Sequence, residues 1–130
     1  GLPDAVDELI SKISSDQLKV SFHSEGFDQR LDSNTETILY RVIQECVNNM
    51  IKHANATELD ISIIKDKDGI SVTIEDNGKG FEYDPAKEDE GIGLKNIRSR
   101  ILFLKGTVDF DSSPGNGTLV AIHIPSKMIP

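Results

Sequence analysis

Residues 75–81, with the sequence EDNGKGF, place two acids, an amide and two glycines directly after the alternating run GISVTI. Alternation of apolar and polar residues is typical of a strand with one buried face, so Asp76 stands where a predicted strand ends. An aspartate at that point can accept a hydrogen bond from an exocyclic amine of a ligand. Gly78 and Gly80 permit positive φ and a close approach to the backbone. The segment is therefore either a plain turn or the floor of a ligand pocket.

A second group of polar residues has spacing i, i+4, i+7 and i+8, which places four side chains on one helical face: Glu45, Asn49, Lys52 and His53. Asparagine offers an uncharged oxygen to a metal ion, glutamate can orient a water or act as a base, and lysine can meet a phosphate as a point charge. The alternative is a solvated helix face with one i,i+4 pair. Taken alone, the spacing favours that alternative.

Two further glycine motifs follow along the chain. GIGL (91–94) opens a predicted helix, and backbone N–H groups at a helix N-terminus form a ready phosphate site. PGNGT (114–118) is a turn between two predicted strands. Each motif is weak evidence alone. Their fixed order, after a Glu-x-x-x-Asn helix and an Asp-x-Gly-x-Gly loop, is the more specific observation.

The elements that must position these motifs follow from periodicity. Helices are predicted at 3–13, 34–54 and 92–104, and Ser33 with Glu36 has the capping-box spacing at the start of the long helix. Alternating runs predict strands at 17–26, 57–64, 70–76, 107–113 and 118–125. The order α-β-α-β-β-α-β-β predicts an α+β fold, a two-layer α/β sandwich with three helices on one face of a mixed, mostly antiparallel sheet.

Composition limits the class of protein. The 130 residues suffice for one domain with a single core, and we expect one domain over residues 1–130. The formal net charge of -8 and the aromatic content of 5% argue against a nucleic-acid surface. No apolar run reaches membrane-spanning length, so this domain is expected to make no direct membrane contact. The one cysteine, Cys46, is typical of a reducing compartment and predicts a cytoplasmic domain.

The motifs together resemble a known family. The segments YRVIQECVNNMIKHA, DNGKGF, GIGLKNIRSRI and SSPGNGT resemble the N, G1, G2 and G3 boxes of the ATP-binding (HATPase_c) domain of bacterial sensor histidine kinases, within the GHKL ATPase superfamily and its Bergerat fold. The sequence pattern LYRVIQE…KHA is most similar to the subfamily with a HisKA_3 type of dimerisation domain. GLPDAVDEL, at the start of the chain, is similar to the usual beginning of the catalytic domain.

The resemblance implies a role for each residue of the polar helix face. Asn49 matches the asparagine that ligates the Mg²⁺ bridging the ATP phosphates, although the adjacent Asn48 leaves the register of the N box ambiguous. Glu45 matches the upstream acid near the metal and its waters, and would share the catalytic role with Asn49. Lys52 and His53 match positions that reach toward phosphate or ribose.

The resemblance also assigns the glycine boxes to the nucleotide. Asp76 matches the acid that hydrogen-bonds the adenine amino group, and Thr118 matches the G3 threonine near adenine. Segment 81–90, which has no period, would be the ATP lid. The other positions that match the nucleotide-binding boxes are Gly78 and Gly80 of G1 and Gly91, Gly93 and Leu94 of G2.

The implied activity is that of a histidine kinase catalytic domain, which binds Mg-ATP and transfers the γ-phosphate to a histidine on a separate dimerisation domain. His23 and His123 lie in predicted strands, so the acceptor helices are expected upstream of this chain, and a response regulator downstream in the signalling pathway. Whether the parent protein is membrane-anchored is left open. Two alternatives are a GHKL serine kinase of the anti-sigma type and a non-catalytic ATP-sensing or docking module. One departure from the family is Lys105, which stands at a usual glycine position after the last helix.

Overall fold

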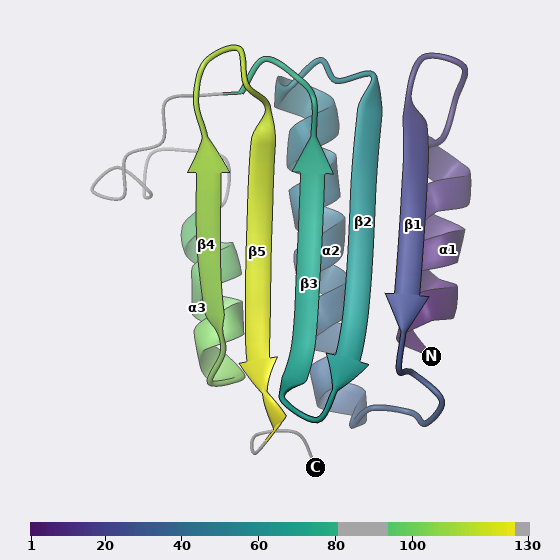
Figure 1. Ribbon diagram of the computed structural model, residues 1–130, viewed down its shortest axis with the longest axis vertical. Coiled ribbons are helices and arrows are strands. Elements are labelled where there is room, and N and C mark those ends of the chain that lie inside the picture. The colour runs from purple at the N-terminus through teal and green to yellow at the C-terminus, as the bar shows by residue number, and fades with distance from the viewer. Residues whose placement is uncertain (81–93, 127–130) are drawn as a thin grey trace.

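A computed structural model describes residues 1–80 and 94–126, and in that part of the chain three helices pack on one face of an open five-stranded sheet (Figure 1). The helices are α1 (Leu2–Ile13), α2 (Ser33–His53) and α3 (Leu94–Phe103). The strands are β1 (Lys19–Glu25), β2 (Glu58–Asp66), β3 (Gly69–Asp76), β4 (Thr107–Ser112) and β5 (Thr118–Pro125). The predicted α+β class and the predicted order of elements are confirmed.

The strands lie in the order β1-β2-β3-β5-β4. The edge strand β1 runs parallel to β2, and the other three pairs are antiparallel. The sheet is therefore mixed and mostly antiparallel, as predicted. Because β3 and β5 pair antiparallel, the end of β3 lies beside the start of β5, with Asp76 opposite Thr118.

The alternating pattern of β3 explains where the core and the site meet. Ile70, Val72 and Ile74 are fully buried against the helices, because every second side chain of a strand points to the same face. Asp76 takes the next position of that series and is only 3% exposed. The last inward position of β3 therefore carries a carboxyl group where the pattern would otherwise place an apolar side chain.

Helix α2 packs its apolar face on the sheet and begins at a cap that the sequence reading missed. The Asp32 carboxylate accepts the N–H groups of Asn34 (3.1 Å) and Thr35 (3.2 Å), which satisfies two free donors of the first turn. Glu36 instead accepts a 2.7 Å hydrogen bond from Arg30. The predicted capping box of Ser33 and Glu36 is therefore wrong, because Asp32 is the cap and an arginine holds the glutamate.

Helix α3 ends in a Schellman motif. The Gly106 N–H donates to the Ile101 carbonyl and the Lys105 N–H donates to the Leu102 carbonyl. Lys105 has φ 62, a conformation that glycine adopts more readily than any other residue, so the departure from the family pattern affects the exit of the helix. Among the described residues, no helix is long and apolar enough to cross a membrane.

Candidate functional site

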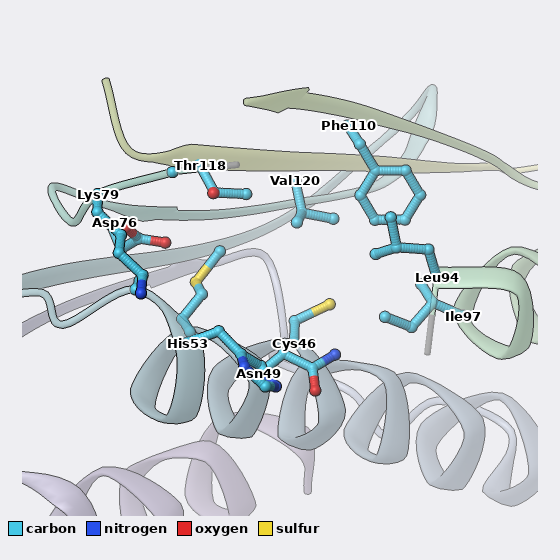
Figure 2. Close-up of a pocket in the computed structure, with 13 residues that line it drawn as sticks. Cys46, Asn49, His53, Asp76, Lys79, Leu94, Ile97, Phe110, Thr118 and Val120 are labelled. Atoms are coloured by element: carbon cyan, nitrogen blue, oxygen red, sulfur yellow. The ribbon is translucent and has the colours of Figure 1, made fainter. Parts of the chain in front are cut away.

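A cavity of about 250 Å³ lies between α2, the end of β3, the inward face of β4 and β5, and the start of α3 (Figure 2). We call one side of it the loop wall, formed by Asp76, Lys79, Gly80 and Thr118. The helix wall is formed by residues of α2 and its C-cap: Cys46, Asn49, Met50, His53 and Ala54. The far end is apolar and consists of Leu94, Ile97, Phe110 and Val120. The cavity thus joins an apolar interior to a few polar groups, which is the usual composition of a small-ligand site.

Asp76 is the polar group that the fold places deepest in the loop wall. Its Oδ1 accepts the Gly78 N–H at 2.7 Å, whereas its buried Oδ2 has no hydrogen-bond partner within the described part of the chain. Burial raises the pKa of this carboxyl, and the backbone N–H groups of Gly78 and Thr118 partly oppose that rise. Buried polar atoms are nearly always paired, so the free Oδ2 marks the place where a ligand donor would bind.

The loop around Asp76 is closed by contacts that only glycine permits. A Cβ on Gly78 would lie 2.3 Å from the Ala54 carbonyl oxygen. Gly80 and Gly117 have φ 64 and φ 71, and a Cβ on Gly117 would lie 2.2 Å from the carbonyl oxygen of Asp76. The glycines therefore serve close packing of backbone on backbone, which fixes the position of the carboxyl group.

Asn77 anchors the same loop from the other side, a role that the sequence reading did not assign. Its Oδ1 accepts the N–H groups of Thr57 and Glu58, at 3.0 and 2.9 Å, and its Nδ2 donates to the Thr57 hydroxyl at 2.9 Å. These three bonds attach the end of β3 to the start of β2. The position of Asn77 beside Asp76 was visible in the sequence, but its partners come from a segment twenty residues away.

The polar face of α2 is divided by the structure. Asn49 and His53 line the cavity. Lys52 is exposed and does not line it, and the same holds for Asn48. Glu45 is also absent from the cavity wall, and its Oε2 accepts a 2.6 Å hydrogen bond from Nη1 of Arg100. Of the four predicted residues, two therefore meet Asp76 around one space, while Glu45 joins α2 to α3.

The remaining predicted residues lie as follows. Leu94 is buried at the start of α3 and lines the far end of the cavity. Thr118 lines the loop wall, with its hydroxyl 2.8 Å from that of Ser112. Gly91, Gly93 and the predicted lid at 81–90 lie outside the described residues.

The sequence reading missed most of the apolar lining and one charged residue. Cys46 and Met50 belong to the core face of α2, and Phe110 and Val120 are inward positions of β4 and β5. Their apolar periodicity predicted burial correctly, but periodicity does not tell a core position from a cavity wall. Lys79, between the two G1 glycines, also lines the cavity.

The polar groups and the apolar lining of the cavity together fit an adenine nucleotide. A flat heteroaromatic base suits the apolar interior, and its exocyclic amine can donate to the free Oδ2 of Asp76. Asn49 supplies an oxygen of the kind that Mg²⁺ accepts. Among the described residues no group of three or more His, Cys, Asp and Glu side chains could hold a metal ion.

The comparisons with known proteins agree with this geometry. The family model described as "Histidine kinase-, DNA gyrase B-, and HSP90-like ATPase" matches residues 34–128, and the chain belongs to this ATPase family. Among curated proteins, the signal transduction histidine-protein kinase/phosphatase DegS of Bacillus subtilis is 37% identical over 116 residues, 86% of this chain and 30% of DegS. The sensor protein VraS of Staphylococcus epidermidis is 32% identical over 96% of this chain and 34% of VraS. The chain thus spans about a third of the length of these relatives.

Solved structures show the same fold. The blue-light activated histidine kinase EL346 of Erythrobacter litoralis superposes with a TM-score of 0.74 at 22% identity, covering 95% of this chain and 40% of that one. The ATP-binding domain of PrrB from Mycobacterium tuberculosis superposes with a TM-score of 0.68 at 21% identity, covering 95% and 90% of the two chains. The two-layer arrangement of this chain is therefore that of histidine kinase ATP-binding domains.

Proposed function

We propose that this chain is the ATP-binding catalytic domain of a sensor histidine kinase, which binds Mg-ATP and presents the γ-phosphate to a histidine on a separate dimerisation domain. The observation that supports it most directly is the Oδ2 of Asp76, which is buried in the cavity wall and has no hydrogen-bond partner among the described residues. A protein that binds no donor at this point leaves a carboxylate oxygen unpaired, at a cost of roughly 1–3 kcal/mol. A ligand amine removes that cost.

The residues of the loop wall would hold the base. Asp76 would accept the adenine amino group, with Gly78 and Gly80 shaping the turn and Thr118 closing the opposite side. Because the loop is fixed by backbone contacts before any ligand binds, little conformational entropy would be lost on binding.

The helix wall would face the sugar and phosphates. Asn49 would hold Mg²⁺ against the phosphates, which the ion would neutralise and orient for in-line attack by an external imidazole. His53 lies one turn further along on the same wall and would contact ribose or phosphate, as would Lys52 after a rotamer change. The G2 residues Gly91 and Gly93 would add backbone N–H groups to the phosphates.

Glu45 would act next to the metal site without lining the cavity itself. It lies one helical turn before Asn49, and its carboxylate is held by Arg100. We assign it the activation of the acceptor imidazole or of a water, with Arg100 limiting its motion.

The partners follow from the relatives. DegS is named as a histidine-protein kinase/phosphatase and VraS as a sensor protein, and each is about three times as long as the matched segment. We therefore assign this chain to the cytoplasmic catalytic part of a longer protein, with dimerisation and phosphoacceptor helices upstream and a response regulator that receives the phosphoryl group.

Calorimetric titration with ATP, with and without Mg²⁺, tests the nucleotide site. The wild type should bind, and Asp76→Asn should lower affinity at least about 100-fold, because an amide donor would then oppose the adenine amine. Thr73→Ala, on the opposite face of the same strand, is the matched control. Near-normal ATP affinity in Asp76→Asn would contradict the assignment.

Transfer from radiolabelled ATP to the dimerisation helices of the parent protein tests the kinase activity itself. The wild type should label a histidine in those helices, and Glu45→Gln should lower the transfer rate more than the ATP affinity. Labelling of a serine in a protein partner would favour the anti-sigma type of serine kinase. Tight ATP binding with no transfer to any acceptor would favour a non-catalytic sensing or docking module.

A further inference from the structure

Lys79 stands in the cavity wall at a position fixed by its own backbone. Its N–H donates to the Ala54 carbonyl at 2.7 Å, and its carbonyl accepts the Gly115 N–H at 2.6 Å. The first partner belongs to the C-cap of α2 and the second to the turn between β4 and β5. Gly78 and Gly80 on either side cannot take a side chain without a clash. The residue between them is therefore held in one place before any ligand arrives.

The Lys79 side chain leaves this fixed point beside Asp76 and extends toward helix α2 along the cavity (Figure 2). Within the described part of the chain its ammonium group forms no ion pair. The protein carries a formal net charge of -8. A cation without a carboxylate partner, on the wall of a cavity in an acidic protein, has a local charge suited to an anionic ligand.

The other cations of the described region are placed differently. Lys52, which the N-box resemblance assigns to phosphate or ribose, does not line the cavity. Arg100 is committed to Glu45, and Arg98 donates to the Val108 carbonyl and stacks over Phe110 at 5.5 Å. Among the lysines and arginines that the structure describes, Lys79 alone lines the cavity.

We propose that Lys79 is a further nucleotide-binding residue, whose ammonium group contacts the phosphate chain. This inference rests on the proposed function, since it takes the ligand to be an adenine nucleotide. An ammonium group has three donors and no acceptor, so its partner must be an acceptor, and the phosphate oxygens are the anionic acceptors of the nucleotide. Charge-assisted hydrogen bonds of this kind are stronger than neutral ones. Asp76 and Lys79, three residues apart, thus divide the nucleotide between a base acceptor and a phosphate donor.

Titration of the chain with ATP, ADP and adenosine at two salt concentrations tests this role, using Lys79→Met, Lys79→Arg and Lys67→Met. Lys67 is exposed in the turn between β2 and β3. That turn lies at the opposite end of the sheet from the end of β3, which carries Asp76 (Figure 1), so the substitution makes the same charge change elsewhere. Lys79→Met should weaken ATP and ADP about tenfold and leave adenosine unchanged. Lys79→Arg should keep most of the affinity, and Lys67→Met should change it less than twofold.

Four results would overturn the inference. Equal losses for adenosine and ATP would place Lys79 at the base or sugar, and equal losses for Lys67→Met and Lys79→Met would reduce the effect to net charge. ATP affinity in Lys79→Met equal to that of the wild type, while Asp76→Asn abolishes binding, would remove the role of Lys79 and leave the nucleotide site standing. No binding of ATP or adenosine by the wild type would contradict both the role of Lys79 and the proposed nucleotide site.

Discussion

The two walls of the cavity are built by different means. In the loop wall, Asp76 and the neighbouring glycines are held by backbone contacts so close that an added methyl group would meet a carbonyl oxygen. In the helix wall, Asn49 and His53 are side chains on a regular helix, and each reaches the cavity through its own rotamer. The position of each loop-wall residue thus depends on backbone contacts with several neighbouring segments. In the helix wall, by contrast, the Asn49 or His53 side chain can be replaced without moving the helix backbone. Substitutions of the glycines that close the loop wall should affect folding and binding together, and those of Asn49 and His53 in the helix wall should act mainly on binding.

The largest expected effect sharpens the rigid side of this comparison. Gly117→Ala should lower the free energy of unfolding by about 3 kcal/mol, because it combines a left-handed φ with a Cβ 2.2 Å from the Asp76 carbonyl oxygen. Gly115→Ala is the matched control, since Gly115 has φ 83 but nothing lies within 4 Å of its added Cβ. It should cost about 1 kcal/mol. Urea unfolding of both variants measures the difference, and equal losses would show that strain and not packing determines this loop.

A smaller effect is expected from the helix wall. Asn49→Ala should weaken ATP binding about tenfold in the presence of Mg²⁺ and leave Mg²⁺-free binding and thermal stability unchanged. Asn48→Ala, one residue away and outside the cavity, should change neither. Calorimetry at a series of Mg²⁺ concentrations, with a thermal melt of each variant, separates these outcomes. A larger Mg²⁺-dependent loss in Asn48→Ala than in Asn49→Ala would reverse the assignment of the metal ligand.

The smallest effect tests whether the buried Asp76 carboxyl of the loop wall lowers the free energy of unfolding. Burial raises the pKa of Asp76 in the folded protein, so folding favours its protonated form. The wild type should therefore lose stability as pH rises from the ordinary aspartate pKa through the raised value. Asp76→Asn cannot ionise, so it should be more stable than the wild type by about 1 kcal/mol above that window and show no such loss within it. Urea unfolding from pH 3 to 7 measures this; a variant less stable than the wild type at neutral pH would contradict it.

The sequence predicted the fold and the place of Asp76 at the end of an inward strand face, because both rest on short-range patterns. The alternation of Ile70, Val72 and Ile74 marks an inward face, and the motif around Asp76 continues it into the glycine turn. The cap of α2 was predicted wrongly because the outcome depended on Arg30, which lies outside the helix and draws Glu36 away from the backbone. Local spacing could not reveal that competition.

The helix wall was harder to predict in detail. Spacing placed four polar residues of α2 on one face, but a helix face is wide, and only the packing of α3 and the loop decides which part of it borders the cavity. Glu45 consequently points to Arg100, a residue fifty-five positions along the chain. In the loop wall, Lys79 carries no periodic signal either, since its place depends on backbone hydrogen bonds to Ala54 and Gly115. The assigned roles of these residues stay predictions until the substitutions are measured.

Cys46 gives the cavity a built-in reporter. It is the one cysteine of the chain, its side chain is buried in the helix wall, and burial raises the pKa of its thiol to about 12. At neutral pH nearly all of it is therefore unreactive thiol, because only the thiolate attacks electrophiles. Alkylation therefore requires an opening of the protein that exposes the thiol, and a ligand bound in the cavity should slow it further. The rate of modification of the unaltered protein, followed by mass spectrometry, thus measures occupancy of the site without any introduced label.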